Sequence, residues 1–127
     1  MPNKRKKREL SEDAAWEMAL ADHPDWRKAL ARDELPEEIV GADGEPMSPR
    51  LHLQMHAIVE RQLAADDPKG IVAIAQQLEQ LGVSGHDVRH EIGRAVANQI
   101  FRALQEDRPF DEQQYFVELR QIVESHR

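Results

Sequence analysis

The chain has 127 residues, of which 32% are charged and 40% hydrophobic, and this composition is typical of one helix-rich domain with a real core. The absence of cysteine excludes disulfides, thiolate metal ligands and a thiol nucleophile. No apolar run approaches the roughly 18 residues needed to span a bilayer, and the basic start lacks the apolar stretch of a secretory signal. We therefore expect a cytoplasmic protein that does not associate with membranes.

The charge is distributed unevenly along the chain. The formal net charge is -7, yet five cations lie together at Lys4–Arg8, and the remainder holds 12 basic against 24 acidic residues. We expect residues 1–10 to be a disordered basic tail. Such a tail attracts nucleic acid or an acidic partner, whereas the acidic body repels them. The alternative is that the tail only aids solubility or folds back onto the acidic body.

Two short helices are expected in residues 11–40. Ser11 is a good N-cap, and acidic residues follow it in the first turn, where the helix dipole favours them. A helix is therefore predicted over about 12–22. His23-Pro24 ends it, because a residue before proline disfavours the helical conformation, and the proline opens the second helix.

A turn-rich segment follows these two helices. Pro36 predicts a brief turn or helix through Val40. The sequence Gly-Ala-Asp-Gly-Glu-Pro at 41–46 is rich in turn-forming residues. We expect a loop over 41–48, which is the only internal boundary that the sequence indicates.

Four longer helices are predicted in residues 49–127. The first begins at Ser48-Pro49 and ends near Ala65, and the second begins at Asp67-Pro68 and ends near Leu81-Gly82. The third begins at Ser84 and ends near Glu106, and the last begins at Asp111. No segment alternates apolar and polar residues as a strand would. The predicted fold class is all-α: a compact single-domain bundle of about five to six helices over 11–127, with the N-terminal helices packing on a C-terminal four-helix core.

Two histidine pairs carry the clearest chemical signal. His52 and His56 form one pair, and His86 and His90 form the other. The i, i+4 spacing places both imidazoles of a pair on one face of a helix. Imidazole is the commonest protein ligand for borderline divalent metals, so two pairs offer four nitrogens to one ion. We interpret the four histidines as candidate ligands of a divalent transition metal, zinc first, with nickel, copper and ferrous iron also suitable.

The expected topology supports this interpretation. In an up-down-up arrangement the two helices that carry the pairs run parallel. Each pair occupies the first two turns of its helix, so the four imidazoles are predicted to meet at one end of the bundle. The alternative is that these are ordinary histidines at the edge of a core, hydrogen-bonded to backbone carbonyls.

Several short motifs around the histidines have a recognisable order and spacing. They are Leu51-His52-Leu53-Gln54-Met55-His56, Asp67-Pro68, His86-Asp87-Val88-Arg89-His90 and the earlier His23-Pro24-Asp25-Trp26. Over roughly residues 16–124 the chain resembles a family of uncharacterised bacterial proteins, domain of unknown function 1841. The resemblance implies a compact helical protein and no particular activity. Within it, His52, His56 and His90 match the family's motif most clearly, and His86 matches only some members.

Two functional hypotheses follow from these observations. The first is a helical protein that binds one metal ion, with or without catalysis. A structural or storage role is favoured, because four imidazoles leave little room for a substrate, whereas displacement of one histidine would open a position for hydrolytic or redox chemistry. The second is a metal-free adaptor whose acidic body contacts protein and whose basic tail at 4–8 contacts RNA or an acidic partner. No residue pattern indicates an enzymatic reaction, since the serines are explained as N-caps and no phosphate-binding loop is present.

Overall fold

A computed structural model describes residues 9–41 and 43–127, which form six helices and one small antiparallel sheet. The helices are α1 (Glu12–Ala21), α2 (Pro24–Ala31), α3 (Pro49–Ala65), α4 (Ile71–Gln80), α5 (Gly85–Gln105) and α6 (Glu112–Ser125). The all-α prediction is confirmed. No helix in this part of the chain is both long enough and apolar enough to cross a membrane. The basic run Lys4–Arg8 lies outside the described residues, so its role stays a prediction.

Local capping explains where four of these helices begin. At each start a side-chain oxygen accepts a hydrogen bond from the backbone N–H three residues later, which satisfies a donor that the helix leaves free. The four capping residues are Ser11, Ser48, Ser84 and Asp111. All four were predicted, because a cap depends only on residues close in sequence.

Helix α4 begins three residues later than predicted. The N-cap is Gly70, whose φ of 105° lies in the left-handed region that favours glycine. The Asp66 carboxylate accepts from the backbone N–H groups of Gly70 and Val72, both at 3.1 Å. The prediction that Asp67-Pro68 opens the helix was therefore wrong, because Asp66 caps the helix from outside it.

The segment before α3 forms a hairpin, where a turn or helix through Val40 and a loop had been predicted. Strand β1 (Ile39–Val40) pairs antiparallel with β2 (Pro46–Met47), and Ile39 lies opposite Met47. The Gly41 N–H donates to the Glu45 carbonyl at 2.8 Å, inside the turn. Two-residue strands are too short to show the alternation that identifies a strand in sequence.

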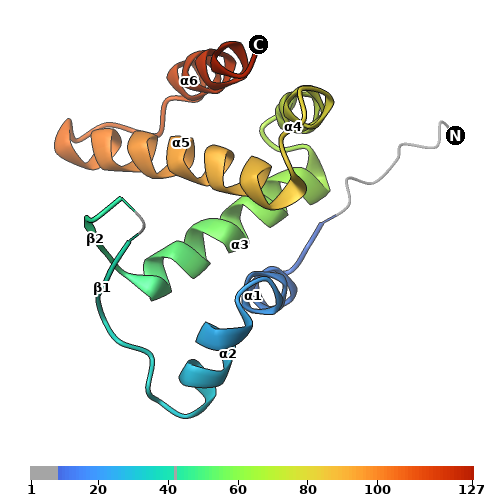
Figure 1. Ribbon diagram of the computed structural model, residues 1–127. Coiled ribbons are helices and arrows are strands. Elements are labelled where there is room, and N and C mark those ends of the chain that lie inside the picture. The colour runs from blue at the N-terminus through green and yellow to red at the C-terminus, as the bar shows by residue number, and fades with distance from the viewer. Residues whose placement is uncertain (1–8, 42) are drawn as a thin grey trace, which may run out of the picture.

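Helix α3 separates two hydrophobic clusters. The larger cluster joins α3 to α4, α5 and α6 and includes Val59, Ile71, Leu78, Ile92, Tyr115 and Leu119. The smaller cluster joins α3 to the N-terminal helices and includes Ala19, Leu20, Leu35 and Leu53. Figure 1 shows this arrangement, with α1 and α2 on one side of α3 and α5 on the other. The N-terminal helices therefore pack on the rest of the bundle, as predicted.

Helices α3 and α5 cross obliquely and run in roughly opposite directions (Figure 1), although the sequence had suggested a parallel pair. The nearly buried Glu60 carboxylate accepts from Arg89 Nε at 2.8 and 3.0 Å, near the end of α3 and the start of α5. Farther along α5, Gly93 lies beside Val59 and Met55. His90 still lies beside His52 and His56, because α5 crosses α3 at Met55 and Val59, within one turn of these two histidines.

A hydrogen bond at the edge of the larger cluster gives a test of this packing. The Tyr115 hydroxyl donates to Gln62 Oε1 at 2.7 Å, and Tyr115 is fully buried. Burial raises the pKa of this phenol, so it stays protonated as a donor. We expect Tyr115→Phe to lower the free energy of unfolding by about 0.5–1.5 kcal/mol in urea, because the half-buried Gln62 amide oxygen loses its partner. Combining it with Gln62→Met should recover part of the loss; equal stability of wild type and Tyr115→Phe would contradict the contact.

Candidate metal centre

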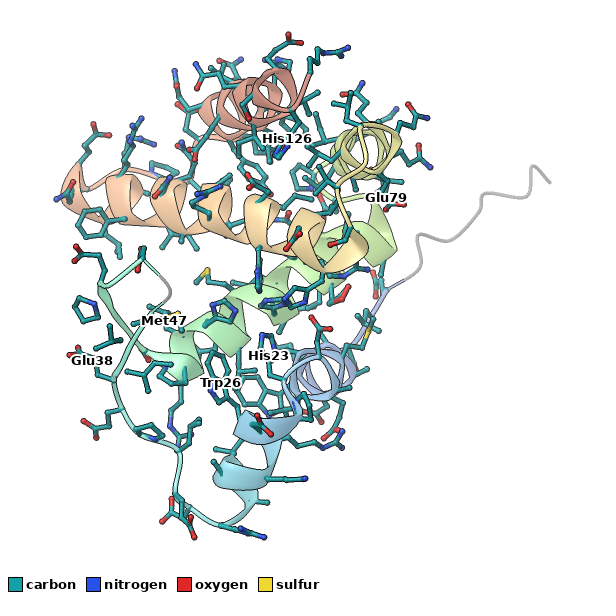
Figure 2. All side chains as sticks on the ribbon, in the orientation of Figure 1. His23, Trp26, Glu38, Met47, Glu79 and His126 are labelled. Atoms are coloured by element: carbon teal, nitrogen blue, oxygen red, sulfur yellow. The ribbon has the colours of Figure 1, made fainter. Side chains whose placement is uncertain are left out.

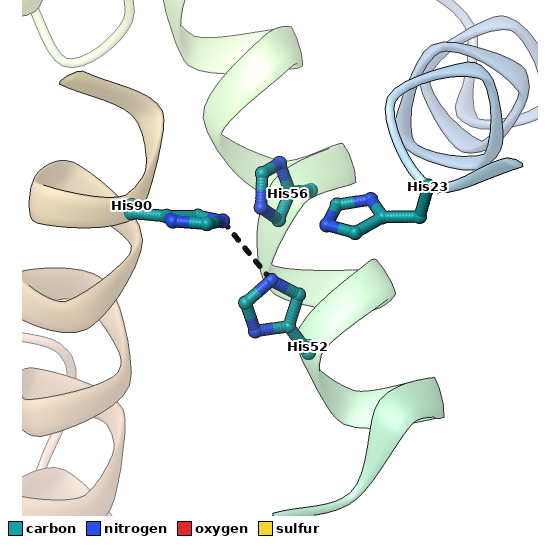
Figure 3. Close-up of side chains that lie close together, drawn as sticks. All are labelled: His23, His52, His56 and His90. Atoms are coloured by element: carbon teal, nitrogen blue, oxygen red, sulfur yellow. Dashed lines mark hydrogen bonds between the residues drawn. The ribbon is translucent and has the colours of Figure 1, made fainter. Parts of the chain in front are cut away.

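Four histidines from three parts of the chain converge on one space. His23 precedes α2, His52 and His56 lie on the first two turns of α3, and His90 lies on the second turn of α5. Each offers one ring nitrogen, and these four atoms all lie within 4.8 Å of one another. Figure 3 shows the four rings pointing toward a common centre. His56 is buried and the other three are half-buried.

The spacing of the four nitrogens suits a small ion. Four points no more than 4.8 Å apart all lie within about 2.9 Å of one common point, and zinc–nitrogen bonds are roughly 2.0–2.1 Å long. Each ring therefore needs to move by less than about 1 Å to reach a shared zinc ion. His52 Nε2 and His90 Nε2 are already 3.2 Å apart, against roughly 3.3 Å between two ligands of a tetrahedral zinc ion.

The hydrogen bonds indicate which nitrogen of each ring faces the centre. His23 Nδ1 donates to the Ala19 carbonyl at 2.9 Å, which leaves its Nε2 lone pair free. His52 and His90 approach each other through their Nε2 atoms. His56 Nε2 is buried and has no hydrogen-bond partner among the described residues. The centre therefore presents Nε2 from all four rings.

The environment keeps His52, His56 and His90 neutral. Burial lowers the pKa of His56 to about 3, and the charges that His52, His23 and His90 would carry lower it further. Burial likewise lowers the pKa of His52 to about 4, together with the neighbouring His90 and His23. The pKa of His90 is also lowered, mainly by burial. At neutral pH these three rings therefore hold free lone pairs, and only neutral imidazole binds a metal.

Trp26 supports two of the four rings. The His23 ring stacks on it, with centroids 4.9 Å apart and planes within 7°. The His52 ring meets it edge-on at 5.3 Å. Figure 2 shows His23 and Trp26 together between the N-terminal helices and α3. This indole gives the centre an apolar wall that fixes the ring positions on one side.

The structure places the sequence-predicted residues in two groups. It brings His52, His56 and His90 together, whereas His86 is outside the set of four. His86 Nδ1 instead donates to Asp22 Oδ2 at 2.8 Å, and its side chain is 45% exposed. Its ring nevertheless borders the centre, with its centroid 4.2 Å from that of His90.

Asp22 was not singled out from the sequence. Its Oδ2 lies 2.8 Å from His86 Nδ1 and 4.0 Å from His56 Nδ1. Burial alone would raise the pKa of Asp22, but the hydrogen bond from His86 and the nearby histidines bring it below its usual value. Asp22 is therefore a carboxylate anion at the edge of the histidine group.

His23 is the ligand candidate that the sequence did not reveal. It was interpreted as the residue that ends α1, and as part of a motif shared with a family. The available signal was its place before Pro24, which fixes it between two helices, with an aromatic residue three positions later at Trp26. That signal is weak, because a histidine between two helices can be identified as a ligand only when the helix packed beside it is known.

The lowered pKa of His56 predicts how the metal-free protein responds to acid. The unfolded chain takes up a proton below about pH 6.5, whereas folded His56, facing His23, His52, His90 and Asp22, resists it. Stability is therefore full above pH 6.5 and falls as the pH falls toward the folded-state value. In the presence of a chelator, we expect the titration of His56 to lower the free energy of unfolding by about 1–2 kcal/mol between pH 7 and pH 5, as measured by urea denaturation.

The matched variants for this measurement are His56→Gln and His126→Gln. His56→Gln should flatten the pH dependence, because an amide does not titrate in this range. His126 lies at the end of α6, on the far side of α5 from the centre (Figure 2), so its replacement removes one histidine and should keep the part of the slope that His56 contributes. An identical slope in wild type and His56→Gln would show that this ring protonates as freely in the folded as in the unfolded chain.

Comparison with known proteins agrees with the family resemblance in the sequence. The family described as domain of unknown function (DUF1841) matches residues 3–121, which include all five histidines around the centre and Asp22. No curated protein and no solved structure matches the chain. The predicted resemblance is confirmed over nearly the whole chain, and the protein belongs to the DUF1841 family.

Proposed function

We propose that this protein binds one divalent transition-metal ion, zinc first, through the Nε2 atoms of its four converging histidines. These residues are His23, His52, His56 and His90. The observation that carries the proposal is His56 Nε2, a buried nitrogen of this convergent set that has no hydrogen-bond partner within residues 9–41 and 43–127. A bound ion supplies the partner that this nitrogen lacks.

Packing alone accounts poorly for such a group. A buried polar atom without a partner costs about 1–3 kcal/mol, and native proteins rarely leave one. Between His52 and His90 the two Nε2 atoms are at hydrogen-bond distance, so one of them must carry a hydrogen when no ion is present. An ion replaces that single bond with four, one to the Nε2 lone pair of each ring.

The donor set favours a structural role. Four imidazoles complete a tetrahedral zinc site and leave no open position for water or substrate, whereas catalytic zinc sites keep one. The ligands come from the α1–α2 junction, α3 and α5, so an ion ties these three segments together. We therefore propose no reaction for this centre.

Metal content and chelator sensitivity test the proposal. We expect protein purified without a histidine tag to carry about one equivalent of zinc by elemental analysis. An ion at 100 times its Kd adds about 2.7 kcal/mol to the native state, so a chelator should lower Tm by roughly 10 °C. His56→Gln should lose the ion and the chelator effect together, and His126→Gln should keep both.

Two results would refute the metal proposal. One is wild-type protein that carries no stoichiometric metal and takes up none from zinc, nickel, copper or ferrous solutions. The other is a wild-type Tm that is identical with and without chelator. Either result would leave the metal-free adaptor as the better hypothesis, to be tested by its binding to protein or RNA.

A further inference from the structure

One carboxylate at the α1–α2 junction faces both of the other segments that supply the histidines, α3 and α5. Asp22 caps the C-terminus of α1 and directly precedes His23. Its Oδ2 accepts from His86 Nδ1 on α5 at 2.8 Å and lies 4.0 Å from His56 Nδ1 on α3. Asp22 therefore connects His56 on α3 and His86 on α5 to the α1–α2 junction.

The two nitrogens of His56 face different surroundings. Its Nε2 is the buried atom of the centre, and its Nδ1 faces Asp22. When Nε2 binds a cation, the ring carries its hydrogen on Nδ1. At 4.0 Å the two atoms are not hydrogen-bonded, and a shift of about 1 Å would bring them to hydrogen-bond distance. A carboxylate that accepts this hydrogen fixes the ring orientation and makes Nε2 a stronger donor to the metal.

His86 is placed to hold that carboxylate. Its Nδ1 is occupied by the hydrogen bond to Asp22, and its half-exposed ring stands beside His90 without joining the four converging nitrogens. The bond from His86 joins α5 to the end of α1 and restricts where the Asp22 carboxylate can lie. His86 therefore acts on the centre through Asp22.

We propose that Asp22 orients His56 from outside the coordination sphere and that His86 positions Asp22. Both residues would strengthen metal binding without contacting the ion. This inference rests on the proposed metal function. It also gives His86, a predicted ligand, a different role at the same site.

The test compares metal binding by paired variants of the full chain. Zinc affinity is measured by competition with a coloured chelator, and coordination by the visible absorption of the Co²⁺ form. Asp22→Asn should weaken zinc binding by roughly 10–100-fold while one ion still binds and the Co²⁺ spectrum is kept. Asp25→Asn removes an equal charge from an exposed position nearby and should bind zinc like wild type.

Replacements at His86 separate positioning from ligation. An asparagine side chain puts an N–H donor near the place of Nδ1 and has nothing at the place of Nε2. His86→Asn should therefore keep the contact with Asp22 and most of the affinity, whereas His86→Ala should lose affinity as Asp22→Asn does. If His86 were a ligand through Nε2, both replacements would instead lower the zinc affinity equally and change the Co²⁺ spectrum.

Each unfavourable result has its own signature. Asp22→Asn that binds zinc as tightly as wild type overturns the role of Asp22 and leaves the metal centre intact. Equal loss in His86→Asn and His86→Ala, with an altered spectrum, overturns the role of His86. If Asp22→Asn fails to fold by circular dichroism, the His86 pair still decides. Wild-type protein that binds no ion refutes the metal function itself, before any variant is compared.

Discussion

Burial of α3 on two sides is the constraint on which the rest of the structure depends. Val59 belongs to the larger hydrophobic cluster and Leu53 to the smaller one, and both are fully buried. Residues of α3 that lie between its two packed faces are enclosed between the N-terminal helices and α5. His56 occupies such a position, between the end of α1 and the start of α5, and is only 3% exposed. The histidine centre thus follows from how α3 is enclosed.

The chemistry at this position is unusual for a core. A leucine at position 56 would fill a similar volume without a polar atom, whereas several neighbouring imidazoles carry nitrogens that must be desolvated. Burial and mutual repulsion both act against protonation, so the pKa of His56 falls to about 3 and that of His52 to about 4. His56 and His52 are consequently stable as neutral rings, which is the form that binds metals. The same burial that makes these residues poor cations makes them good ligands.

The sequence predicted best what depends on residues close together. The serine and aspartate caps define four helix starts, and the i, i+4 spacing put His52 and His56 on one face. His90 and His86 could not be separated by spacing, because the choice depends on the angle at which α5 crosses α3. His23 could not be found, because its position depends on how the N-terminal helices pack on α3. The two-residue strands were missed because they are too short to show an alternating pattern, and the start of α4 because Asp66 accepts from Gly70 and Val72 across a turn.

The histidine centre adjoins helix α2, which hydrophobic packing stabilises only weakly. Helix α2 has no buried residue, so it depends on half-buried contacts, among them Trp26 in the smaller cluster. Trp26 also stacks on His23, so the attachment of α2 and the position of one proposed ligand are a single arrangement. An ion held by His23 and by α3 and α5 would therefore stabilise this arrangement in particular. Docking of the N-terminal helices and occupation of the metal site then form one coupled equilibrium, because each favours the same packed state.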